Sequence, residues 1–101
     1  MKTIAEIQNL IAAKKDFLLN RFGIAHLVVY GSYAKGKATD SSDLDLMYEL
    51  AEGRGMTLTR LQNLEQFFRD LLQVDKIELV RKQFMEPIIS AAVQKEGIAI
   101  F

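Results

Sequence analysis

The chain of 101 residues contains no cysteine, which excludes disulfide bonds and thiolate metal sites and is compatible with a reducing compartment. Lys and Arg together number 13, as do Asp and Glu, and this balance argues against a sequence-independent grip on nucleic acid. No apolar run approaches the length of about 18 residues that spans a membrane, and the N-terminal segment lacks the unbroken apolar core of a signal peptide. These absences predict a cytosolic protein that binds no membrane and does not bind nucleic acid stably.

Length and composition predict one globular domain, residues 1–101. A chain of this size buries roughly two-thirds of the surface that its unfolded form exposes. Half of the residues are hydrophobic and 26% are charged, which is an ordinary balance for a globular protein. No repeat, low-complexity tract or linker divides the sequence.

Capping residues and apolar spacing predict three helices. Thr3 and Glu6 form a T-x-x-E capping box, which begins a helix that ends at Gly23. A second helix begins at Thr57 or Thr59, and its apolar face is formed by Leu61, Leu64, Phe68 and Leu71. The only proline, Pro87, suits the first turn of a third helix that ends at Gly97.

Short apolar runs predict four strands, at 25–30, 44–50, 76–80 and 98–101. The strands alternate with the helices along most of the chain. The fold class that follows is α/β (α+β), a mixed β-sheet of about four strands flanked by helices.

The stretch GSYAKGK (31–37) follows the first predicted strand and has the composition of a phosphate-binding loop. Gly31 lets the backbone approach a ligand closely. If the loop turns into a short helix, its free N–H groups form an anion site, to which Lys35 and Lys37 add positive charge. The alternative is a tight strand-to-helix turn with solvated lysines. The loop alone leaves both interpretations open.

Asp43 and Asp45 stand two positions apart at the start of the second predicted strand, so both carboxylates leave the same face. Their Cα atoms are expected about 6.6 Å apart, close enough for both to reach one or two divalent cations. The alternative is an exposed strand end whose acids cap turns. The preceding loop favours a metal site, because Mg²⁺ bridges carboxylates and triphosphate and removes the repulsion between them.

The pattern G-S-x-A-[K/R]-G followed by S-D-x-D-L resembles the nucleotidyltransferase superfamily typified by DNA polymerase β. The residues that match are Gly31, Ser32, Ala34, Lys35, Gly36, Ser42, Asp43, Asp45 and Leu46. The length and C-terminal segment resemble the minimal nucleotidyltransferases (MNT), prokaryotic proteins usually paired with a HEPN-domain toxin. The resemblance implies a palm-like fold, ATP as substrate and Mg²⁺, two ions, as cofactor.

The resemblance also implies roles for single residues. The triphosphate of ATP is expected on the Gly31–Ser32 loop, with Lys35 and Ser42 also in the nucleotide site. Asp43 and Asp45 are expected to hold Mg²⁺ ions.

A third acid, often Asp, stands on the next strand in this family, where the chain has Glu78 within KIELV. Asp75 is a rival for this role, but it precedes the strand. The resemblance therefore implies Glu78 as the third metal ligand. Glu78 is also the candidate for taking the proton of the acceptor hydroxyl.

MNT relatives imply an antitoxin of a type VII-like toxin–antitoxin pair, which transfers AMP from ATP to a protein hydroxyl, a tyrosine of a HEPN toxin. The terminal strand 98–101 is a candidate edge for a homodimer or for a hetero-oligomer with the toxin, or it completes the sheet. The alternative function is a nucleotide-binding module with a weak or inactive site, which neutralises a HEPN partner by contact.

A third interpretation is a P-loop NTPase, since Gly31, Gly36 and Lys37 spell G-x-x-x-x-G-K. Ala38 follows, however, and lacks the hydroxyl that would hold Mg²⁺. The next residues, TDSSD, indicate a turn rather than a helix. This interpretation is therefore the least favoured of the three.

Overall fold

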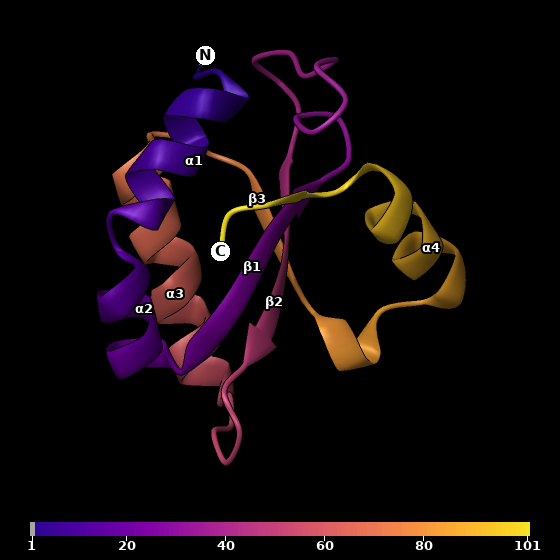
Figure 1. Ribbon diagram of the computed structural model, residues 1–101. Coiled ribbons are helices and arrows are strands. Elements are labelled where there is room, and N and C mark those ends of the chain that lie inside the picture. The colour runs from indigo at the N-terminus through magenta and orange to yellow at the C-terminus, as the bar shows by residue number, and fades with distance from the viewer. Residues whose placement is uncertain (1) are drawn as a thin grey trace.

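The computed structural model describes residues 2–101, which form one four-stranded sheet with helices on both of its faces (Figure 1). In chain order the elements are α1 (Ile4–Ala12), α2 (Lys15–Phe22), β1 (Ile24–Tyr30), β2 (Leu44–Leu50), α3 (Leu58–Leu72), β3 (Ile77–Arg81), the 3-10 turn η1 (Lys82–Phe84), α4 (Pro87–Glu96) and β4 (Ile98–Ala99). The predicted fold class is confirmed.

The sheet has the strand order β3-β2-β1-β4 and mixes parallel and antiparallel pairs. β1 runs antiparallel to both β2 and β4, whereas β2 and β3 run parallel. Helices α1, α2 and α3 cover one face, and α4 lies on the other side of the sheet (Figure 1). A parallel neighbour needs a crossover connection, and α3 supplies it between β2 and β3.

The core lies between the sheet and α1–α3. In β2, Leu44, Leu46 and Tyr48 are buried, and the alternation of side chains along a strand turns Asp45 and Glu49 to the opposite face. The helices contribute buried Ile, Leu and Phe side chains, namely Ile7, Ile11, Leu18, Phe22, Leu64, Phe68 and Leu72. Each fully buried side chain of this size stabilises the fold by about 1.5–3 kcal/mol. The apolar face of the sheet is therefore held against α1–α3, and the opposite face, with Asp45 and Glu49, is left for a site.

The predicted single N-terminal helix is wrong in one respect, because it is broken after Ala12. Lys14 has φ −105° and ψ 14°, outside the helical range, and its N–H donates to the Ile11 carbonyl at 2.9 Å in a tighter turn. Residues 12–17 are all exposed, so no core side chain opposes the break. Both predicted ends hold: the Thr3 capping box is present, and Gly23 ends α2 in the left-handed conformation.

The other predicted ends of helices and strands agree with the observed ends within one or two residues. Strand 44–50 is confirmed, and Thr57 rather than Thr59 is the N-cap of α3. The predicted strand 98–101 shortens to Ile98–Ala99. Its last residues still bond to β1, since the Ile100 N–H donates to the Leu27 carbonyl at 2.8 Å. The terminal segment therefore completes the sheet.

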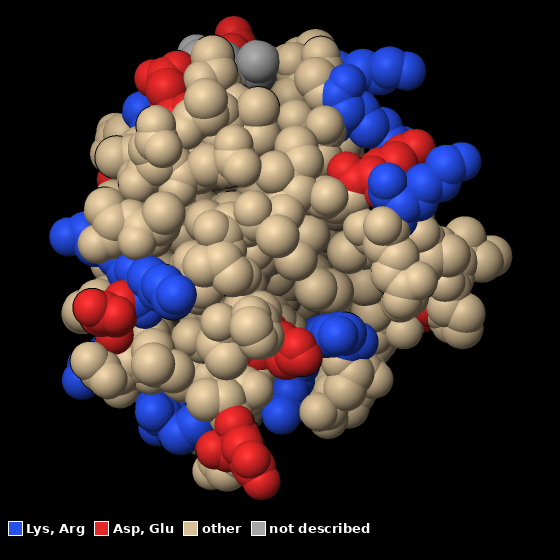
Figure 2. Space-filling view, in the orientation of Figure 1, with Lys and Arg blue, Asp and Glu red and all other residues tan. Residues whose placement is uncertain are grey.

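The surface carries charges of both signs. On the face shown in Figure 2, Lys and Arg are interspersed with Asp and Glu around a broad uncharged area and form no single basic stripe. Among residues 2–101, no helix has the length and apolarity that crossing a bilayer requires.

Candidate active site

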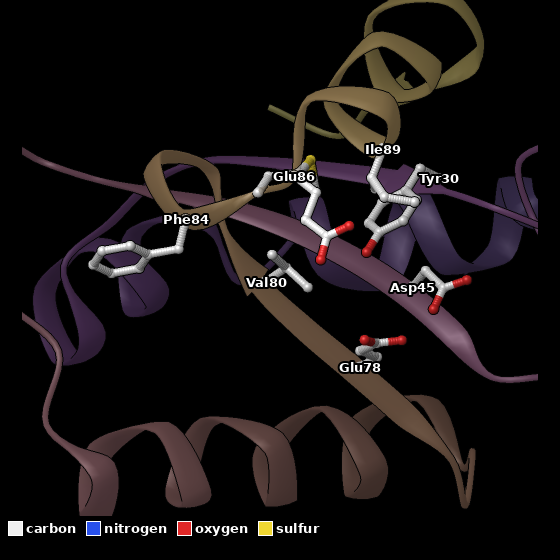
Figure 3. A pocket seen from close by; sticks show the side chains of 8 residues that line it. Tyr30, Asp45, Glu78, Val80, Phe84, Glu86 and Ile89 are labelled. Carbon is white, nitrogen blue, oxygen red and sulfur yellow. The ribbon is translucent and has the colours of Figure 1, made fainter.

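Two acidic residues face each other across the central strands. Asp45 of β2 is directly paired with Glu78 of β3, and Tyr30 of β1 is paired with Asp45 on the other side. Side chains alternate between the faces of a strand, so these three residues form one row on the face away from α1–α3. We call Tyr30, Asp45 and Glu78 the acid row. Figure 3 shows the Asp45 and Glu78 carboxylates lying close together.

The acid row concentrates negative charge. Burial raises the pKa of Asp45 to about 6, with further contributions from hydrogen bonding to Glu78 and from the charges of Glu78 and Asp43. Burial together with the Asp45 and Glu78 charges also raises the pKa of Tyr30 to about 12, so its phenol keeps its proton at neutral pH. None of the salt bridges formed among residues 2–101 involves Asp43, Asp45 or Glu78.

This unneutralised pair of carboxylates fits a hard divalent cation, since Mg²⁺ prefers oxygen ligands and its charge relieves like-charge repulsion. Asp43 is exposed and lies just before β2, near enough for its charge to raise the pKa of Asp45. Within residues 2–101, no three acidic or histidine side chains converge as a preformed metal cluster. The structure thus brings two of the three predicted ligands together and leaves Asp43 at their edge.

The Gly31 loop lies directly against Asp45. Gly31 has φ +74°, and a Cβ atom at this position would collide with Asp45 Oδ2. Both facts require glycine here. The loop is a hydrogen-bonded turn rather than the short helix considered above. Its backbone bonds run from Lys35 N–H to the Gly31 carbonyl at 3.1 Å and from Lys37 N–H to the Ser32 carbonyl at 2.9 Å.

Two predicted nucleotide-binding side chains have other partners. Lys35 Nζ lies 3.3 Å from Glu96 Oε2, at the end of α4. Ser42 Oγ accepts a hydrogen bond from the Thr39 N–H at 2.9 Å and closes the turn before Asp43. Their roles in nucleotide binding stay predictions.

The rival third acid, Asp75, does not belong to the acid row. It precedes β3 and lines a separate cavity together with Asp40 and Lys76. Glu78 is the acid that the strand register pairs with Asp45.

A cavity of about 440 Å³ opens beside the acid row. We call it the η1–α4 cavity, and its lining residues are Tyr30, Asp45, Glu78, Val80, Phe84, Met85, Glu86 and Ile89. Figure 3 shows the two carboxylates at one end and Phe84 at the other. Apart from Asp45 and Glu78, the residues that line this cavity were not predicted from the sequence. The period-two pattern of β1 could have found Tyr30, whereas no local signal shows that η1 and α4 lie over the sheet.

Residues 13–101 match the family model for polymerase beta, nucleotidyltransferase. The chain therefore belongs to the polymerase beta nucleotidyltransferase family: it is a nucleotidyltransferase, its substrate is a nucleotide, and the resemblance seen in its sequence is confirmed. The protein adenylyltransferase MntA of Thermococcus cleftensis is 31% identical over 100 residues, which cover 99% of this chain and 98% of that protein. A solved structure described as a minimal nucleotidyltransferase is 31% identical, with a TM-score of 0.72 over 92% of each chain.

Two solved toxin–antitoxin complexes share the fold at lower identity. One contains AMP-PNP and has a TM-score of 0.73 at 19% identity, over 93% of this chain and 72% of the other. The second holds a tri-AMPylated HEPN toxin of Shewanella oneidensis with an MNT antitoxin. Its TM-score is 0.63 at 20% identity, over 93% of this chain and 71% of the other.

Proposed function

We propose that this chain, acting as one domain in the cytoplasm, is a Mg²⁺-dependent adenylyltransferase that moves AMP from ATP to a tyrosine of a HEPN-domain toxin. The observation that carries the proposal is the Asp45–Glu78 pair, two unneutralised carboxylates directly beside the Gly31 loop. A relative named protein adenylyltransferase and the fold shared with an MNT antitoxin bound to an AMPylated toxin support it.

The proposed reaction is an in-line displacement at the α-phosphorus of ATP. The acceptor oxygen forms a bond to this phosphorus while the bond to the bridging oxygen of the β-phosphate breaks. The electron pair of the broken bond leaves with pyrophosphate, and the acceptor proton passes to a carboxylate. Glu78 is exposed at the rim of the η1–α4 cavity and is the residue that we assign to receive this proton.

The chain's own residues bind and orient the substrates. The Gly31 loop lets the triphosphate approach the backbone, and Asp43, Asp45 and Glu78 would hold two Mg²⁺ ions. Bound Mg²⁺ stabilises charge on the attacking and leaving oxygens. Tyr30 stays protonated beside Asp45, so it adds no third charge to the paired acids and can donate a hydrogen bond.

Transfer of AMP would neutralise the toxin by adding a phosphate charge and a bulky group at the modified tyrosine, without unfolding the toxin. A binding module that blocks the toxin by contact alone stays the alternative. A P-loop NTPase is disfavoured, since Lys37 is followed by a turn at 39–42 in which Ser42 N–H donates to the Thr39 carbonyl at 3.0 Å, rather than by a helix.

The test is co-expression with a HEPN protein, which we expect to be encoded beside this chain's gene, followed by mass spectrometry of the purified partner. We expect AMP on a tyrosine of the partner, and no AMP when Asp43 and Asp45 are both replaced by Asn. An unmodified partner that the double variant still neutralises would establish the binding module instead. Failure to form any complex would exclude both functions.

A further inference from the structure

We infer that the η1–α4 cavity is the subsite for the acceptor side chain, and that its apolar wall selects an aromatic hydroxyl over an aliphatic one. This inference rests on the proposed function and assigns the second substrate of the same site. The residues that determine acceptor specificity are then Met85 and Ile89, with Val80 beneath them.

The strand register orders the parts of the site along one line. Two residues below the acid row, on the same face, Val28 pairs with Met47 and Met47 pairs with Val80. Gly31 lies beyond the acid row in the opposite direction, because it follows Tyr30. The acid row therefore stands between the Gly31 loop on one side and the floor of the cavity, at Val80, on the other.

This order decides where the acceptor enters. In an in-line displacement, the attacking oxygen and the leaving pyrophosphate lie on opposite sides of the α-phosphorus. If the triphosphate lies on the Gly31 loop and the α-phosphorus at the acid row, pyrophosphate leaves on the loop side. The attacking oxygen must then come from the side of Val80, where the cavity lies.

The composition of the wall decides which hydroxyl fits. Val80, Met85 and Ile89 present apolar surface, and the ring of Tyr30 closes another side (Figure 3). Glu86 is the one charged residue of the lining besides Asp45 and Glu78. A phenol ring would cover this surface while its hydroxyl reaches the two carboxylates at the acid end. A serine or threonine side chain is too short to do both, so it would leave apolar wall exposed to water and gain less from burial.

The mouth of the cavity fits an acceptor carried by a polypeptide. Phe84 is 71% exposed and Ile88 is 84% exposed, unusually high for large apolar side chains. Phe84 lines one end of the cavity, and Ile88 precedes the lining residue Ile89 in α4. We take the occupant to be a partner segment that presents a tyrosine into the cavity and covers Phe84 and Ile88 at its rim.

The chain has no cysteine, which allows a direct test with single thiols. Ile89→Cys places a thiol in the cavity wall, and Ile88→Cys is the matched control on the adjacent, outward-facing position. Met85→Cys gives a second cavity probe should the helix variant fold poorly. The rate of maleimide labelling is measured with Mg²⁺ and a non-hydrolysable ATP analogue, with and without N-acetyl-L-tyrosinamide or N-acetyl-L-serinamide.

We expect the tyrosine amide to slow labelling of Ile89→Cys at least about threefold once it exceeds twice its dissociation constant. The serine amide should have no effect at the same concentration, and Ile88→Cys should label at one rate throughout. Equal protection by both amides, or none up to the solubility limit, would overturn the assignment. Protection by the ATP analogue alone would also overturn it, since the cavity would then hold the nucleobase.

Transfer kinetics separate this inference from the function on which it rests. With the HEPN partner as acceptor, Ile89→Ala should raise the KM for the acceptor several-fold while the affinity for ATP stays unchanged. If the wild type modifies its partner and Ile89→Ala changes no constant, only the cavity assignment is wrong. If the wild type transfers no AMP at all, the proposed function is wrong and the acceptor subsite with it.

Discussion

Gly31 and Asp45 are in such close contact that one added carbon atom at residue 31 would overlap Asp45 Oδ2. The loop that is expected to receive the triphosphate is thereby held against the carboxylate that is expected to hold the metal. The glycine also has φ +74°, so its backbone conformation and the space beside it both exclude a side chain.

Replacing Gly31 by alanine should therefore cost more than the same change at Gly36. Gly36 has φ +71°, but a Cβ atom added there would meet no other atom within 4 Å, so Gly36→Ala incurs only the left-handed backbone penalty of about 1–2 kcal/mol. Gly31→Ala adds displacement of Asp45, and we expect both a larger loss of stability and a loss of ATP affinity. Chemical denaturation and ATP titration measure the two effects. Equal destabilisation would mean that the loop moves away from Asp45 without cost.

The double variant Asp43→Asn with Asp45→Asn should lose AMP transfer by at least about a hundredfold, because several kcal/mol of charge stabilisation disappear with the metal. Lys37→Ala is the control, since Lys37 is exposed and is not among the residues that match the nucleotidyltransferase pattern, whereas the P-loop interpretation depends on it. Radiolabelled ATP follows transfer in both proteins. The opposite ranking of the two variants would revive the NTPase interpretation.

Glu78→Gln should reduce transfer by about 10²–10⁴-fold if the carboxylate accepts the proton of the acceptor. Binding of ATP should weaken little, since the Gly31 loop is intact. The matched control is Asp75→Asn, which changes the rival acid outside the acid row. A low transfer rate in Asp75→Asn combined with normal transfer in Glu78→Gln would reassign the third acid.

The raised pKa of Asp45 predicts a pH-dependent stability. Its pKa increases from 3.8 to about 6 on folding, first through burial and then through Glu78 and Asp43. Between these values the folded state holds a proton that the unfolded state has released, so this carboxyl makes folding less favourable as pH rises through the window. Asp45→Asn lacks the penalty. Its melting temperature should exceed that of the wild type above pH 6, and the difference should shrink toward pH 4; a constant difference would contradict this origin.

Ligand binding should stabilise the folded protein through the same acids. Saturating Mg²⁺ with ATP should raise the melting temperature of the wild type, because a ligand that binds only the folded state adds RT ln(1 + [L]/Kd) to its stability. The Asp43/Asp45 double variant should show no such increase. Equal increases in the two proteins would locate the cation elsewhere.

The features that could be predicted from the sequence are local ones. The capping box of Thr3, the left-handed stop at Gly23 and the strand 44–50 all depend on neighbours within a few positions, as do the glycine loop and the two-residue spacing of Asp43 and Asp45. The break after Ala12 was missed because the exposed residues 12–17 include neither glycine nor proline and carry no strong breaking signal.

The partners of Lys35 and the wall of the η1–α4 cavity could not be predicted in this way. Lys35 belongs to the loop motif, yet its ammonium group pairs with Glu96 at the far end of the chain. Ile89 and Met85 follow a strand and a turn whose direction over the sheet is set by packing.

The sequence by itself determined the kind of chemistry, since residue type and short spacing decide which groups a loop and a strand can present. The tertiary structure decided their arrangement. Parallel pairing of β2 with β3 brings Glu78 beside Asp45, and partial burial of Asp45 raises the pKa of its carboxyl. Placement of η1 and α4 over that face adds an apolar wall to the acids. Strand register, desolvation and packing between distant segments act through space, so no window of the sequence contains them.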